Sequence, residues 1–100
     1  MFIDELREAV RKGKVLIRKH ADERAGSRKI PFSAVIDVIL QGEAIEDYPE
    51  AKPFHACLMM KHTEGEPLYV VCSFDGEYCY IITVHWLDPD KWKDPWTRRK

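Results

Sequence analysis

The sequence has no long apolar run, no CxxC pair and almost no net charge. No stretch approaches the roughly 20 apolar residues that span a bilayer. The N-terminal segment MFIDELREAV carries acidic side chains where a signal peptide would carry basic ones. We therefore expect a cytoplasmic protein with no membrane partner. A chain of 100 residues with 45% hydrophobic composition is expected to form one domain, 1–100, with one modest core.

The cysteine spacing excludes two common kinds of site. Cys57, Cys72 and Cys79 all fall in predicted strands and form no CxxC motif, so neither a zinc ribbon nor a redox pair is indicated. We expect three buried, reduced thiols. His55 and Cys57 share a face of a predicted strand with His62 nearby, but no further ligand spacing completes a zinc site. We expect no metal site.

The net charge of −1 conceals an uneven distribution along the chain. Residues 1–30 carry nine Lys and Arg against five Asp and Glu, which gives +4, and residues 91–100 carry five against one, also +4. Residues 31–90 carry two against eleven, which gives −9. The acidic middle argues against extended binding along a nucleic-acid backbone, whereas the basic segments leave room for a local site.

Apolar residues at helical spacing predict a helical layer over residues 1–42. A first helix has a buried stripe of Ile3, Leu6 and Val10 and ends near Gly13. A second helix is expected over about 17–28, although the apolar patch 15–17 is also compatible with a strand.

The third predicted helix is the most apolar, and we expect it to cover the sheet. Pro31 suits its first turn and Gly42 its end. Its core side contains Phe32, Val35, Ile36, Ile39 and Leu40, of which the last four should be buried against the last two strands.

Residues 43–87 switch to the alternation typical of strands and predict a four-stranded antiparallel sheet. The expected strands are Glu43–Tyr48, His55–Thr63, Leu68–Phe74 and Tyr78–Leu87. The fold class is therefore α+β, with N-terminal helices followed by this sheet. The tail, 88–100, has no periodicity and is expected to wrap over the surface with Trp92 or Trp96 as an anchor.

The length of the last hairpin loop decides which side chains share a face. A three-residue loop, 75–77, puts Tyr69 opposite Thr83 and places both on one face with His85. A two-residue loop, 75–76, moves His85 to the other face. We favour three residues because the polar side chains then gather on one face. The face toward the helices would then contain Leu68, Val70, Cys72, Phe74, Tyr80, Ile82 and Val84.

Five stretches carry a resemblance. They read HADERAGSRKIP from His20, GEAIEDYP from Gly42, PLYVV from Pro67, IITVH from Ile81 and PDKW from Pro89. Their order and spacing resemble a bacterial domain-of-unknown-function family with the pattern HAxERMxERGIS, GeiIeDYP, plHvv and iiTvY. The resemblance covers about residues 18–92.

That family resembles the RelE- and MqsR-type toxins of toxin–antitoxin systems. The resemblance implies a RelE-like fold and cleavage of mRNA, free or on the ribosome, without a metal or other cofactor. It also implies a cognate antitoxin of zinc-finger or helix-turn-helix type. The alternative is a non-catalytic protein-binding module on the same fold.

Metal-free RNA cleavage needs a base for the 2′-hydroxyl, a cation for the phosphate and an acid for the leaving oxygen. His suits proton transfer near neutral pH, and the Arg fork matches phosphate. The candidates for catalysis are His20, Arg24, Tyr69 and His85, and those for substrate binding are Lys19, Arg28 and Thr83. Each also has a structural interpretation: local packing of His20, ion pairs of the arginines with Glu46 or Asp47, and ordinary cross-strand contact of Tyr69 and His85.

The sequence departs from the family pattern at four positions. Tyr69 stands where the family has His, and His85 stands where it has Tyr, as if the two had been exchanged between neighbouring strands. Lys29 replaces a Gly that would end the second helix, and Gly26 interrupts that helix.

Overall fold

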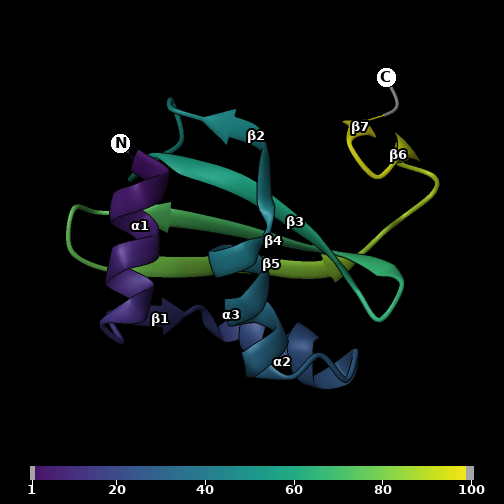
Figure 1. Cartoon of the computed structure of the whole chain (residues 1–100), viewed down its shortest axis with the longest axis horizontal. Coiled ribbons are helices and arrows are strands. Elements are labelled where there is room, and N and C mark those ends of the chain that lie inside the picture. Colours follow the sequence, from purple (N-terminus) through teal and green to yellow (C-terminus); the bar gives the residue numbers. More distant parts are fainter. Residues whose placement is uncertain (1, 99–100) are drawn as a thin grey trace.

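A computed structural model describes residues 2–98 and shows helices on one layer and a strongly twisted sheet on the other (Figure 1). Three helices and four strands make up the first three quarters of the described chain. In chain order these are α1 (Phe2–Arg11), β1 (Val15–Ile17), α2 (Lys19–Ser27), α3 (Phe32–Gln41), β2 (Glu43–Tyr48), β3 (Ala56–Thr63) and β4 (Glu66–Phe74). They are followed by β5 (Cys79–Trp86) and by two short strands, β6 (Trp92–Asp94) and β7 (Thr97–Arg98).

The main sheet is five-stranded and mixed, so the predicted four-stranded antiparallel sheet of a RelE-like fold is wrong. Its strand order is β1-β5-β4-β3-β2, and β1 pairs with β5 in parallel, with Val15 opposite Cys79. A patch of three apolar residues is too short for its periodicity to separate strand from helix. Pairing resolves the ambiguity, because the Lys14 carbonyl accepts a hydrogen bond from the Cys79 amide at 3.0 Å.

The helices divide the covering of the sheet between them. α3 packs on β3 and β4, whereas α2 packs on β5, so the predicted contact of α3 with the last two long strands is right for β4 and wrong for β5. Of the four α3 side chains expected in the core, Val35 and Ile39 are fully buried and the other two are partly buried. Phe32 is 49% exposed and Val38 is buried instead, because the helix turns a slightly different stripe toward the strands.

The β4–β5 hairpin brings Tyr69 and His85 directly opposite each other, which confirms that they share a face. The expected register is nevertheless wrong. Phe74 pairs with Cys79, so the loop contains four residues, 75–78, and its turn is held by the Asp75 carboxylate, which accepts from the amides of Glu77 and Tyr78. If this register continued unbroken along both strands, Tyr69 would pair with Val84 and the His85 side chain would lie on the face toward the helices.

A β-bulge corrects that offset. Cys72 pairs with Ile81 whereas Val71 pairs with Thr83, so Ile82 is the extra residue on β5. Beyond the bulge the register advances by one, and His85 returns to the open face of the sheet beside Tyr69. Between the loop and the bulge the four-residue loop sets the faces, so Cys79 and Ile81 point into the core under the helices, not Tyr80 and Ile82 as predicted.

The tail folds back as a hairpin, β6–β7, at the end of the molecule away from α1 (Figure 1). Trp92 is only 2% exposed and packs with Leu58, Met60 and Tyr69 on the open face, so it is the anchor of the tail. Trp96 remains 50% exposed. The three cysteines are free and buried, as predicted. No helix among residues 2–98 is long and apolar enough to cross a membrane.

Lys29 ends α2 in a conformation that favours glycine, and this gives a stability prediction. Its φ is +57°, a left-handed value that costs most residues about 1–2 kcal/mol. We expect Lys29→Gly to raise the free energy of unfolding by about 0.5–1 kcal/mol, after the greater chain entropy of glycine is subtracted. Urea unfolding would measure the change, and Lys29→Ala, which keeps the strain, should show no such gain.

Candidate functional site

His85 lies in a pocket on the open face of the sheet, lined mainly by basic side chains. The pocket has a volume of about 430 Å³. Val71 and Thr83 contribute from the strands, and Asp88 is its one carboxylate. Its cationic residues are Arg24 from α2, Arg28 from the C-cap of α2, and Lys91 and Arg98 from the tail. We call this cavity the His85 pocket.

The surroundings keep His85 neutral. Burial lowers its pKa first, and the positive charges of Arg28, Arg98 and Lys91 lower it further, to about 4. Asp88 acts in the opposite direction. Four cations against the one carboxylate of Asp88 leave the lining of the pocket with a net positive charge. A neutral imidazole can accept a proton at physiological pH.

Tyr69 supports His85 from behind and does not line the pocket. Its ring stacks on the imidazole at 5.2 Å between centroids and on Trp92 at 4.9 Å. The residue is fully buried, and its hydroxyl donates a hydrogen bond to the Pro95 carbonyl at 2.7 Å. Burial raises the pKa of that hydroxyl, so it stays protonated. The arrangement makes Tyr69 a positioning residue for His85.

α2 and its C-cap supply two arginines because β1 covers only the first part of the β5 edge. Past Ile17 the chain leaves the sheet, and α2 runs along the remaining edge of β5. Arg28 donates a hydrogen bond from Nη1 to the Val84 carbonyl at 2.7 Å, which fixes its side chain beside the pocket. Among residues 2–98, neither Arg24 nor Arg28 forms an ion pair with Glu46 or Asp47. Those carboxylates pair with Arg98 and His55.

The remaining predicted residues lie in an adjoining pocket. This second cavity, of about 480 Å³, is lined by Arg18, Lys19, His20 and Ile82 and shares Arg24 and Thr83 with the His85 pocket. We call it the α2 pocket. The side chain of His20 is 89% exposed, with Glu23 at 4.0 Å, so it does not face His85. The predicted site residues are thus divided between two neighbouring cavities. Arg28 and His85 line the His85 pocket, Lys19 and His20 line the α2 pocket, and Arg24 and Thr83 line both.

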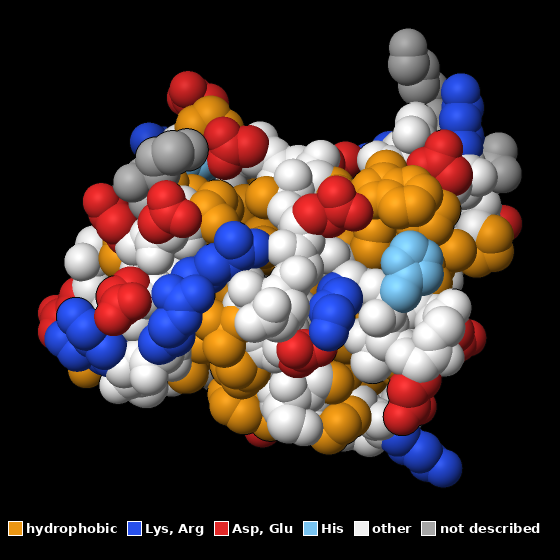
Figure 2. Space-filling view, viewed as in Figure 1, with side chains coloured by type: hydrophobic (Ala, Val, Ile, Leu, Met, Phe, Trp, Pro, Cys, Tyr) orange, Lys and Arg blue, Asp and Glu red, His pale blue; other side chains and the backbone are white. Residues whose placement is uncertain are grey.

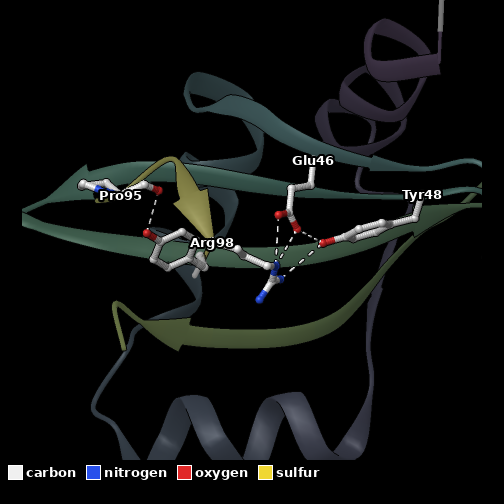
Figure 3. A network of polar contacts seen from close by, with 5 residues as sticks. Glu46, Tyr48, Pro95 and Arg98 are labelled. Carbon is white, nitrogen blue, oxygen red and sulfur yellow. Dashed lines mark hydrogen bonds and ion pairs between the residues drawn. The ribbon is translucent and has the colours of Figure 1, made fainter. Parts of the chain in front are cut away.

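Two cations of the His85 pocket, Lys91 and Arg98, were not among the predicted site residues. Arg98 is held in place by Glu46, which accepts from its Nε at 3.1 and 3.0 Å, and by the Tyr48 hydroxyl at 3.4 Å (Figure 3). Its guanidinium also lies 4.5 Å over the Trp92 ring. The +4 charge of the tail was the available signal, but only the fold shows that the tail reaches His85.

The segment EAIEDY, which forms β2, therefore has a structural role. Glu46 and Tyr48 point from β2 toward the tail and bind Arg98 (Figure 3). The Pro95 carbonyl of the tail accepts the hydrogen bond from Tyr69 of β4. Asp47 points the other way and binds His55, which stacks on Phe2 at 3.7 Å. His55 and Cys57 are thus occupied in separate contacts, and Cys57 lies 3.8 Å from the Cys72 sulfur.

A family model described as Domain of unknown function (DUF4258) matches residues 17–86. The chain belongs to this family. No curated protein and no solved structure matches the chain. The DUF4258 match runs from the end of β1 to the end of β5 and includes Arg24, Arg28 and His85. Lys91 and Arg98 lie beyond the matched residues.

The pKa of His85 should respond to an anion in the pocket. In the free protein the imidazole should stay neutral until the pH falls to about 4, because burial and three cations disfavour its charged form. Bound phosphate brings negative charge close to the ring, which favours the charged form, so the transition should move toward neutral pH. Titration of the His85 ring by NMR, with and without inorganic phosphate, measures the shift. A downward shift, or none with phosphate bound, would contradict the assigned pocket.

Proposed function

We propose that this protein cleaves RNA without a metal ion, with the His85 pocket as its active site. The observation that carries the proposal is a neutral imidazole among four cations: Arg24, Arg28, Lys91 and Arg98. Such a pocket offers a proton acceptor and several donors for one phosphate, which are two of the requirements of RNA cleavage. The proposed chemistry rests on the site alone, because the five-stranded mixed sheet is not the one expected of a RelE-like fold.

The proposed reaction is an internal transfer at one RNA phosphate. His85 removes the proton of the 2′-hydroxyl, the 2′-oxygen forms a bond to phosphorus, and the bond between phosphorus and the 5′-oxygen breaks. The leaving 5′-oxygen takes a proton from solvent. The products are a 2′,3′-cyclic phosphate and a 5′-hydroxyl end. The arginines bind the phosphate oxygens, on which negative charge accumulates in the transition state.

Binding of substrate would also adjust the base. The pKa of His85 in the free protein, about 4, makes it uncharged but weakly basic. A phosphate bound between Arg28 and Lys91 offsets the cations that lower this pKa, and raises it toward the operating pH. A general base is most effective when its pKa lies near that pH. His85 would therefore become a stronger base only when a phosphate occupies the pocket.

The biological role that we propose is that of a toxin related to the RelE and MqsR types, acting on mRNA and neutralised by a cognate antitoxin. The support for this is the resemblance of the segments at 20–31, 42–49 and 81–85 to the pattern of a family that itself resembles these toxins. Induced expression in bacteria should arrest growth, and coexpression of an antitoxin encoded beside the gene should relieve the arrest.

Purified protein and a single-stranded RNA test the chemistry directly. We expect cleavage to persist in EDTA and to leave cyclic phosphate ends. Loss of cleavage in EDTA, or products that carry a 5′-phosphate, would overturn the proposed reaction. Binding of RNA with no cleavage under any condition would favour a non-catalytic binding module instead.

A further inference from the structure

The His85 pocket and the α2 pocket adjoin, because Arg24 and Thr83 line both. The two cavities lie side by side along the β5 edge, and we call the pair the cationic groove. Its charged walls contain Arg18, Lys19, Arg24, Arg28, Lys91 and Arg98. Asp88 is the one carboxylate among the residues that line the two pockets.

Most of these cations are not engaged by carboxylates. Among residues 2–98, Arg98 is paired with Glu46, and none of the other five groove cations forms an ion pair. On α1, by comparison, basic and acidic side chains are interspersed on the surface (Figure 2). There Arg11 pairs with Glu8, and Lys14, just beyond the helix, pairs with Glu77. Other described lysines, such as Lys12 and Lys29, also lack ion pairs, so the distinguishing feature of the β5 edge is that several such cations lie together there.

We infer that the cationic groove binds single-stranded RNA over at least two phosphates, with a second phosphate site at Arg18 and Lys19. This inference rests on the proposed function and specifies its substrate: an oligonucleotide, not a mononucleotide. The first phosphate lies in the His85 pocket. Arg24 lies at the junction of the two cavities and contacts both phosphates.

The dimensions and the chemistry of the groove support a strand. The two cavities, of about 430 and 480 Å³, together exceed what one phosphate group requires. The α2 pocket adds the exposed imidazole of His20 and the apolar Ile82, which offer contact surfaces for a base or sugar. Electrostatic contact with successive phosphates is the main source of affinity in single-strand binding and makes it depend on salt.

Binding of short oligonucleotides of increasing length tests the second site. The probes are fluorescein-labelled 2′-O-methyl RNAs of one to six nucleotides, which lack the attacking hydroxyl. We expect the affinity of the wild-type protein to rise steeply beyond one nucleotide. The double variant Arg18→Ala/Lys19→Ala should bind a tetranucleotide roughly tenfold more weakly and lose about 0.7 from the salt slope, since each phosphate neutralised on a single strand contributes about 0.7. Its affinity for a mononucleotide should be unchanged.

Two further variants separate the sites. Arg28→Ala should weaken the binding of every length, because Arg28 belongs to the first phosphate site. Lys12→Ala removes the same charge from the end of α1, outside both cavities, and should leave all affinities unchanged.

The outcomes distinguish this inference from the proposed function. Wild-type affinity independent of length, or a tetraglutamate peptide that binds as tightly as a tetranucleotide, would overturn the inference even if RNA is cleaved. Length-dependent binding that the double variant abolishes, in a protein that cleaves no RNA, would support the inference and overturn the proposed activity.

Discussion

We expect Gly42→Ala to destabilise the protein by about 3 kcal/mol or more. Gly42 joins the end of α3 to β2. Its backbone angles are those of an ordinary extended chain, so what requires glycine here is the lack of space for a side chain. A Cβ atom there would lie 2.4 Å from the Val38 carbonyl oxygen and 2.6 Å from that of Met60. Both obstacles are backbone atoms, one in the helix and one in β3, and neither can move without separating the two layers.

The surrounding contacts make relaxation costly. The carbonyl of Gly42 accepts a hydrogen bond from Nη2 of Arg7 at 2.6 Å, and Nε of Arg7 binds the Ile39 carbonyl at 2.9 Å. The Gly42 amide in turn donates to the Val38 carbonyl at 2.9 Å. A shift of the chain at Gly42 would strain all three bonds at the end of α3.

Gly26→Ala is the matched control for this substitution. Gly26 lies in α2, and a Cβ atom added there would have no neighbouring side chain or strand within 4 Å, so the new methyl group meets open space. Helix propensity then favours alanine by about 0.5–1 kcal/mol. Urea unfolding of the two variants measures both effects, and the packing would be contradicted if Gly42→Ala matched the wild type.

The second large effect is expected on activity. His85→Gln should lower the rate of RNA cleavage by about 10²–10⁴-fold, the usual contribution of a positioned general base. Glutamine retains hydrogen-bonding capacity but cannot accept a proton near neutral pH. Because His85 stacks on Tyr69, the unfolding of the variant must be measured alongside its rate, so that loss of chemistry is separated from loss of fold.

His62→Gln provides the control for this loss. His62 lies on the same face of the sheet, exposed and 5.9 Å from the Trp96 ring, and lines neither cavity of the cationic groove. The variant should cleave RNA at the wild-type rate. Equal rates for His85→Gln and the wild type would remove His85 from the mechanism.

The hairpin shows what sequence reasoning could reach. Clustering polar side chains on one face correctly placed Tyr69 and His85 on the same face, because burial of the apolar face is a strong constraint on register. The predicted register was wrong in two places, the loop length and the bulge at Ile82. Each shifts the pairing by one residue, so Tyr69 pairs with His85 in place of Thr83, and a shift of two leaves the face unchanged. A single bulged residue leaves no clear mark on an apolar run such as CYIITV.

Other features depended on contacts between distant segments. The helices at 2–11 and 32–41 followed from periodicity, but β1 acquires its identity only from its pairing with β5. Arg24 and Arg28 were recognisable as a basic side of α2. Lys91 and Arg98 were not recognisable as site residues, because the tail lacks periodicity and its position depends on Trp92 and on Glu46.

The most direct test of the central claim is cleavage of one RNA in two forms under EDTA, with and without 2′-hydroxyl groups. If His85 removes the 2′-proton, the wild-type protein should cut the natural RNA and leave a 2′,3′-cyclic phosphate, while the 2′-O-methyl form should bind but stay intact. Cleavage of the 2′-O-methyl RNA at a comparable rate would contradict the account, because the attacking oxygen would then have to come from elsewhere.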